Sequence, residues 1–222
     1  MKTYEETYRI LLDEFKDYNK AWDCLIEFLA LSNYPKFFFM VDHKFEWLFQ
    51  NKQLAERLMR VYDLPLLKTD RHDYLGDLLI KYRNELGNNY DPIMITPSDE
   101  FVERTVKQDI KSTDKPVRIL DLGTATGRYL LKISEIAPNA IVFAIDKDIR
   151  LLRIAFANCA IHNIQAYLLC ADYLIHDVDH KTEDGKHNWK YANKWYPCWD
   201  KLKLVTNASK RRKYKQHGYT VL

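Results

Sequence analysis

Two of the chain's six glycines stand in one short stretch, Gly123-Thr124-Ala125-Thr126-Gly127, which follows an apolar run and precedes an amphipathic one. The residues between these glycines are small, which is typical of a tight turn from a strand into a helix. Such a turn lets the backbone approach a ligand closely, and the helix N-terminus presents N–H groups to it. The stretch therefore predicts a small-molecule site on this turn.

Three acidic residues extend the candidate site, because Asp121, Asp146 and Asp172 each end an apolar run. In an open parallel sheet, ligands bind beyond the carboxyl ends of the strands. Asp121 lies beside the glycine turn. At the end of the next strand, Asp146 can accept hydrogen bonds from both hydroxyls of a ribose, and Asp172 can accept one from an adenine amino group. Together the three acids indicate a site for an adenosine compound.

The elements that must position these residues alternate between strand and helix from Val117 onward. This alternation is typical of a parallel sheet with crossover helices, so the sequence predicts an α/β, Rossmann-like fold. We expect three strands and two helices, with a fourth strand at 201–207. The expected strands are 117–123, 141–148 and 166–174, and the expected helices are 128–137 and 149–163.

Residues 1–90 form a separate region in which apolar residues recur at helical spacing. One helix is expected over 45–62, and another from an N-cap at Asp70 to a C-terminal stop at Gly87. The turn-forming residues 87–92 mark the boundary, which gives an N-terminal helical region over 1–90 and a cofactor-binding domain over 91–222. A further helix is expected to begin after Ser98. We also expect the N-terminal helices to cover a sheet edge left open by missing strands.

The glycine turn and the three acids resemble those of the class I S-adenosylmethionine-dependent methyltransferases. The third glycine of a dinucleotide-binding turn is absent, because the helix begins with Arg128-Tyr129. The resemblance implies that the turn passes the methionine part of S-adenosylmethionine, that Asp146 holds the ribose and that Asp172 holds the adenine.

Residues 73–174 resemble, more narrowly, the adenine-N6 DNA methyltransferases, notably the modification subunits of type I restriction systems. The match rests on Ile95, Thr96 and Pro97 just before a helix, a segment that in that family closes over the methionine end of the cofactor. The cofactor-binding residues that the resemblance implies are Thr96, Pro97, Asp121, Gly123, Thr124, Ala125, Gly127, Asp146, Lys147, Asp172 and Tyr173.

The chain departs from that family where the fourth strand should end. The family has Asn or Asp, two prolines and an aromatic residue, whereas this chain has Asn207-Ala208-Ser209-Lys210. Without rigid acceptors and a stacking ring, we expect cofactor binding with little or no adenine-N6 transfer. The catalytic residues stay unassigned. Two alternatives remain open, a cofactor-binding protein that has lost methyl transfer and a partner of a longer methylase or specificity subunit.

Other features carry less chemistry. The cluster His176-Asp177-Val178-Asp179-His180 has metal-binding side chains without further ligands at regular spacing, so no metal site is predicted. The basic run 210–215 is as compatible with a solvated tail as with phosphate contacts. Aromatic residues at 189–199 are expected to pack as a lid, with base stacking as the alternative.

Composition sets broad limits on the remaining choices. The net charge of +3 does not by itself indicate nucleic-acid binding, so DNA, preferred over RNA, is a partner only through the resemblance. The four cysteines show no Cys-x-x-Cys spacing, which favours a reducing cytoplasm. No signal peptide or membrane-spanning stretch is recognised, so no membrane partner is expected.

Overall fold

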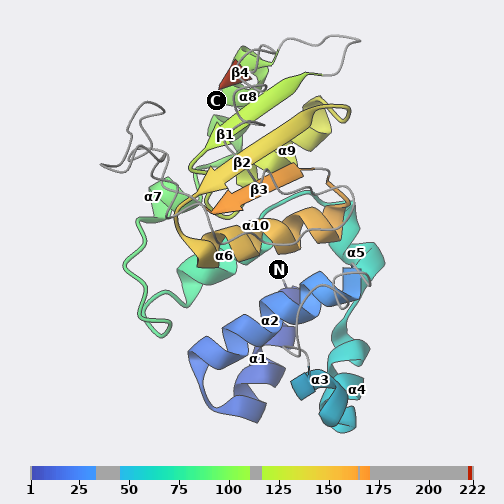
Figure 1. Cartoon of the computed structure of the whole chain (residues 1–222). Coiled ribbons are helices and arrows are strands. Elements are labelled where there is room, and N and C mark those ends of the chain that lie inside the picture. The colour runs from blue at the N-terminus through green and yellow to red at the C-terminus, as the bar shows by residue number, and fades with distance from the viewer. Residues whose placement is uncertain (1, 34–45, 111–116, 165, 171–219, 222) are drawn as a thin grey trace, which may run out of the picture.

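The computed structural model describes residues 2–33, 46–110, 117–164, 166–170 and 220–221 (Figure 1). The sheet has the strand order β3-β2-β1-β4, and every pair of neighbours is parallel. This is the beginning of the Rossmann order. The strands are β1 (Arg118–Leu122), β2 (Ile141–Asp146), β3 (Ala166–Cys170) and β4 (Thr220–Val221). The predicted α/β, Rossmann-like fold is therefore confirmed.

One face of the sheet packs on three helices, α8 (Asp99–Asp109), α9 (Arg128–Ile136) and α10 (Ile149–His162). Alternate strand residues supply this core, since successive side chains of a strand point to opposite faces. They are Ile119, Val142, Ala144, Ala166 and Leu168. On the other face, Phe143 and Tyr167 stack with ring centroids 4.3 Å apart.

The N-terminal region, in the residues that the structure describes, is built from helices. In chain order they are α1 (Lys2–Phe15), α2 (Tyr18–Asn33), α3 (Glu46–Gln50), α4 (Lys52–Val61), α5 (Leu64–Thr69) and α6 (Tyr74–Lys81), and the short α7 (Pro92–Ile95) follows the proposed boundary. Their apolar residues form a second core with one side of α10.

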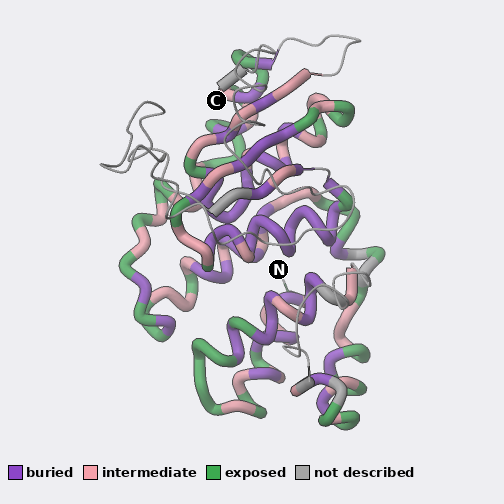
Figure 2. Tube along the Cα trace, viewed as in Figure 1, coloured by how far each residue is buried: buried purple, intermediate pink, exposed green. Residues whose placement is uncertain are grey.

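Helix α10 belongs to both cores and is buried almost all round (Figure 2). Leu152, Phe156 and Cys159 face the sheet core, whereas Leu151 and Ile154 face the N-terminal helices. Such all-round apolar character is what a helix needs between two packed layers. Helices α1, α2 and α4 thus lie beyond α10, on its side away from the sheet (Figure 1). The expectation that the N-terminal helices cover a sheet edge left open by missing strands stays a prediction, because residues 171–219 lie outside the described part.

Local details differ from the sequence-based expectations at helix ends. The helix expected over 45–62 is divided at Asn51, whose side chain accepts from the Leu54 N–H and starts α4. The N-cap of α6 is Asp73 and not Asp70. The same helix ends at Lys81 and not at Gly87, which lies in the following turns with a φ of +64°. Ser98 caps α8 as predicted. The fourth strand expected at 201–207 lies outside the described residues, and the described β4 was not predicted.

Candidate functional site

The glycine turn between β1 and α9 has an unusual backbone. Gly123, Ala125 and Gly127 have φ values of +80°, +49° and +87°. The N–H groups of Gly123 and Thr124 both donate to the Ile145 carbonyl, at 2.7 and 3.0 Å, which holds the turn against the end of β2. The small residues are therefore needed for the left-handed conformations.

Gly127 has a second reason to be glycine. A Cβ at this position would lie 3.0 Å from the Cβ and 3.1 Å from the Cα of Ala155 in α10. Gly127 is also the N-cap of α9, and no side chain of the described residues caps that helix. The turn thus brings the uncapped N-terminus of α9 to the carboxyl edge of the sheet, as the sequence predicted.

Asp121 provides a buried carboxylate beside this turn. It is 4% exposed, and within the described residues neither its Oδ2 atom nor the neighbouring Thr124 hydroxyl makes a hydrogen bond of normal geometry. Burial raises the pKa of Asp121 to about 6, the charge of Asp146 acts in the same direction, and the nearby Thr124 hydroxyl opposes the rise. Buried polar atoms without partners are rare in folded proteins, so these two atoms indicate a place for a polar ligand.

Asp146 ends β2 on the same side of the turn. Its Oδ2 accepts from the Ala125 N–H and its Oδ1 from the Asp148 N–H, both at 2.8 Å. Burial raises the pKa of this carboxyl group, and the two N–H donors oppose the rise. Since each carboxylate oxygen has further lone pairs, Asp146 can still accept hydroxyl groups of a ligand.

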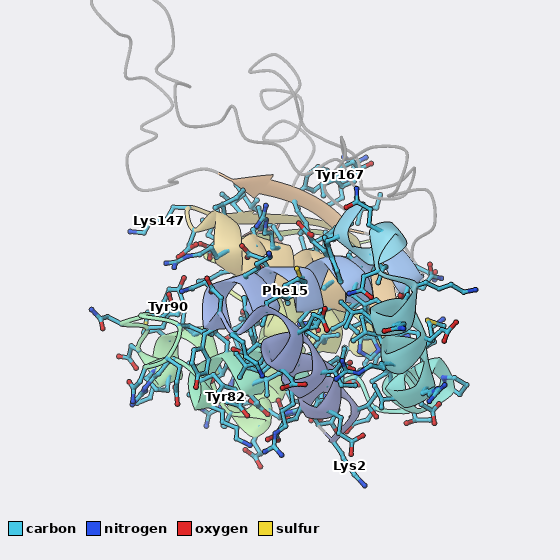
Figure 3. All side chains as sticks on the ribbon, turned by 90° about the horizontal axis from the view of Figure 1, so that it is seen from below. Lys2, Phe15, Tyr82, Tyr90, Lys147 and Tyr167 are labelled. Carbon is cyan, nitrogen blue, oxygen red and sulfur yellow. The ribbon has the colours of Figure 1, made fainter. Side chains whose placement is uncertain are left out.

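The loop after Asp146 is fixed by the chain just before α7. The Tyr90 hydroxyl donates to Asp148 Oδ2 at 2.5 Å, and the Arg150 guanidinium donates to Asn88 Oδ1 at 2.8 Å. Lys147 is exposed and extends away from the body of the molecule (Figure 3). The expectation that Lys147 helps to bind the cofactor remains a prediction.

The predicted Thr96-Pro97 segment lies against the same turn. The Pro97 carbonyl accepts from Arg128, the first residue of α9, at 2.9 Å, and the Thr126 hydroxyl contacts the Ile95 carbonyl at 3.4 Å. Thr96 itself closes α7 by donating from its N–H to the Pro92 carbonyl at 2.8 Å. The structure thus places the Thr96-Pro97 segment against the glycine turn, which Asp146 also contacts.

Several sequence-predicted positions lie outside the described residues. Asp172 and Tyr173 follow the end of β3, and Asn207 belongs to the same group of untested positions. The histidine-aspartate cluster at 176–180, the aromatic residues at 189–199 and the basic run at 210–215 are also outside the described part.

Sequence reasoning missed a buried polar cluster behind the turn, formed by Asp73, Thr126, Arg128 and Asn158. One signal was available. Asn158 is a polar residue inside the otherwise apolar run 154–161, where a buried amide needs hydrogen-bond partners. The assignment of the helix start to Asp70 hid the second signal, Asp73.

Comparisons with known proteins give partial likenesses. The chain is similar to the release factor glutamine methyltransferase of Flavobacterium psychrophilum, with 35% identity over 68 residues, which are 30% of this chain and 24% of that protein. It therefore spans about a quarter of that relative's length. No family model matches the sequence.

Two solved structures are also similar. One is a class I S-adenosylmethionine-dependent methyltransferase from Listeria monocytogenes, with a TM-score of 0.48 and 16% identity over 75% of this chain and 52% of that one. The other is a type I restriction-modification methyltransferase subunit from Streptococcus thermophilus, with a TM-score of 0.40 and 14% identity over 81% of this chain and 41% of that one.

Proposed function

We propose, from the class I S-adenosylmethionine-dependent methyltransferase fold that this chain adopts, that it is the cofactor-binding unit of a methyltransferase acting on nucleic acid. The observation that carries the cofactor is the pair of buried atoms beside the glycine turn, Asp121 Oδ2 and Thr124 Oγ1, neither of which makes a hydrogen bond of normal geometry to the described residues. The turn, the uncapped start of α9 and Asp146 surround the same place in the fold.

The chemistry of these residues fits S-adenosylmethionine. Its methionine part carries an ammonium group, which would give a donor to the Asp121 carboxylate and the Thr124 hydroxyl. Its carboxylate suits N–H groups at a helix N-terminus. Its ribose would donate to Asp146, and its adenine amino group would donate to Asp172. When bound, the cofactor supplies a methyl group on a sulfonium, which a nitrogen nucleophile can accept.

This chain's own residues would orient the cofactor and exclude water from it. Asp146 and the Ala125 N–H fix one another, so the ribose acceptor and the turn backbone form one unit. Arg128 holds the Thr96-Pro97 segment next to the turn through the Pro97 carbonyl. Such fixed groups lower the cost of organising the site during the reaction.

Adenine in DNA is the acceptor that the resemblance of residues 73–174 favours, and the Thr96-Pro97 position supports it. The likeness to a release factor glutamine methyltransferase favours a second candidate, a glutamine side-chain amide of a protein. Both acceptors present a planar nitrogen whose lone pair is delocalised, so the same cofactor site suits either.

A methyl-transfer assay separates these candidates. The chain is incubated with tritiated S-adenosylmethionine and, in separate reactions, duplex DNA, single strands, RNA and a bacterial release factor. Because positions 207–210 lack the prolines and the ring, we expect less than about one turnover on DNA by the chain alone. Several turnovers on duplex DNA, abolished by Asn207→Ala, would show that this turn is competent. Transfer confined to the release factor would instead establish the glutamine acceptor.

The third possibility is that a longer methylase or specificity subunit completes the site. In that case, transfer to adenine would appear only when the partner chain is added to the same reaction. A catalytically inactive cofactor-binding protein would give no transfer under any of these conditions.

A further inference from the structure

Asp73 has no exposed surface and lies at the start of α6, in the N-terminal region. Its Oδ1 accepts from the Gly76 N–H at 2.8 Å and from the Asn158 amide at 2.7 Å. Its Oδ2 accepts from the Thr126 hydroxyl, inside the glycine turn, and lies 3.6 Å from Arg128 Nε. One carboxylate therefore connects α6, α9, α10 and the turn.

Thr126 is held from two sides by this arrangement. Asp73 accepts a hydrogen bond from the Thr126 hydroxyl, and the Asn158 amide donates to the Thr126 carbonyl at 2.9 Å. Its neighbours Ala125 and Gly127 both have positive φ, which is costly for the alanine. A conformation of this kind persists only where the surroundings determine it. Thr126 is the turn residue that Asp73 and Asn158 hold, just as Asp146 holds Ala125 from the other side.

Gly76 makes the close approach possible. A Cβ at Gly76 would lie 2.1 Å from Asp73 Oδ2 and 2.9 Å from the Thr126 hydroxyl. No side chain other than hydrogen fits between α6 and the turn. Gly76 thus allows the Asp73 carboxylate, in the N-terminal region, to reach Thr126 in the glycine turn.

A second row of charges supports the same contact from outside. Arg128 donates to Asp77 Oδ1 at 2.5 Å, and His72 lies between Asp77 and Asp99, at 2.5 and 2.7 Å. Acidic and basic groups alternate along this row, so each charge has an oppositely charged neighbour. Burial raises the pKa of Asp73, and Arg128 and three hydrogen-bond donors oppose the rise.

We propose that Asp73 is a positioning residue, which holds the glycine turn in its binding conformation through Thr126 before any cofactor arrives. The N-terminal helices then contribute to cofactor binding without touching the cofactor. This inference rests on the proposed function only for its effect on binding. The conformation of the turn can be tested without a ligand.

The test uses amide hydrogen exchange of the whole chain, with calorimetry of S-adenosylhomocysteine binding as a second readout. Thr126→Val removes the hydroxyl at nearly constant shape, and Thr126→Ser keeps it. Thr7→Val is the matched control, because Thr7 is also fully buried but donates within α1, to the Thr3 carbonyl at 2.8 Å.

Losing one buried hydrogen bond changes an equilibrium constant by about tenfold. We therefore expect Thr126→Val to speed exchange of the Ala125 and Gly127 amides about tenfold and to weaken binding by a similar factor. Thr126→Ser should stay close to the wild type. Thr7→Val should leave both the turn amides and the affinity unchanged.

Two results would overturn the proposal. One is wild-type exchange at the turn in Thr126→Val. The other is exchange that rises equally over α1, α2 and the turn, which would indicate general destabilisation. If the wild type binds no S-adenosylhomocysteine, the proposed function fails, but the exchange result still decides whether the Thr126 hydroxyl, which donates to Asp73, holds the turn.

Discussion

The Ala125 N–H donates to Asp146 Oδ2 at 2.8 Å, so the turn after β1 is bonded to the acid that ends β2. This single hydrogen bond joins the two parts of the candidate site that the sequence placed on neighbouring strands. It also means that Asp146 has two tasks, since the same carboxylate supports the turn and is the expected ribose acceptor.

Asp146→Ala should weaken the binding of S-adenosylhomocysteine by about 1–3 kcal/mol, because hydroxyl groups and the Ala125 N–H lose a charged acceptor. Calorimetry measures the change. Asp13→Asn, an exposed acid on α1, serves as the control and should bind like the wild type. Asp172→Asn should cost less than Asp146→Ala, because a carboxamide oxygen still accepts from the adenine amino group. Unchanged affinity in Asp146→Ala would exclude this residue from ribose binding.

Cofactor affinity should rise with pH through the titration of Asp121. Its pKa of about 6 in the free protein means that the carboxyl group is protonated in acid and charged near neutrality. A ligand ammonium group favours the charged form and lowers this pKa, so binding releases a proton near pH 6. S-adenosylhomocysteine should therefore bind more tightly at about pH 7 than at about pH 5. Asp121→Asn should remove the dependence, and a dependence that survives this change would assign it to another group.

The contacts of His72 with Asp77 and Asp99 predict a loss of folding stability at alkaline pH. Hydrogen bonding to Asp77 and, to a smaller extent, to Asp99 raises the pKa of His72 from 6.5 to about 9. The folded state thus binds the proton more tightly than the unfolded chain, so the stabilisation is complete below pH 6.5 and is lost as the pH rises through about 9.

His72→Gln should accordingly be less stable than the wild type by about 1–3 kcal/mol at pH 6.5 and nearly equal to it above pH 9. Urea unfolding at both pH values measures the difference. A difference that stays constant with pH would mean that the charge of His72 does not contribute.

Two glycines with positive φ provide a matched pair for the packing of α9 on α10. Alanine at Gly87 meets no heavy atom within 4 Å, so Gly87→Ala should cost only the backbone strain, about 1 kcal/mol. Gly127→Ala adds the contact with the Ala155 backbone and should cost a further 1–3 kcal/mol, roughly. Urea unfolding of both variants checks the order. Equal losses would show that α9 moves away from α10 without penalty.

The sequence was informative where local chemistry determines the structure. The strand-helix alternation, the Ser98 cap and the position of Asp121 and Asp146 near strand ends were predictable, because each depends on a few neighbouring residues. The glycine turn was predictable for the same reason, as positive φ values limit the residues that fit.

The rest depends on contacts between distant residues. Asp73 and Thr126 are 53 positions apart, and no spacing in the sequence relates them. Asn51 divides an apolar-periodic run because its side chain caps α4, where periodicity alone favoured one helix. The pairing of Thr220 with Ile119 also joins residues that are far apart in the sequence, and its only local signal is that Thr220 and Val221 are β-branched.

Among the described helices, none is long and apolar enough to span a bilayer.

The most direct test of the account is a titration of the wild-type chain with S-adenosylhomocysteine, followed by amide chemical shifts in two-dimensional NMR. The account predicts saturable binding with a Kd at or below roughly 100 μM. The largest shifts should fall on the Gly123, Ala125 and Gly127 amides and on Asp146, with little change in α1 and α4. No binding at millimolar ligand, or saturable binding whose shifts lie away from the turn, would contradict the central claim that this turn is a cofactor site.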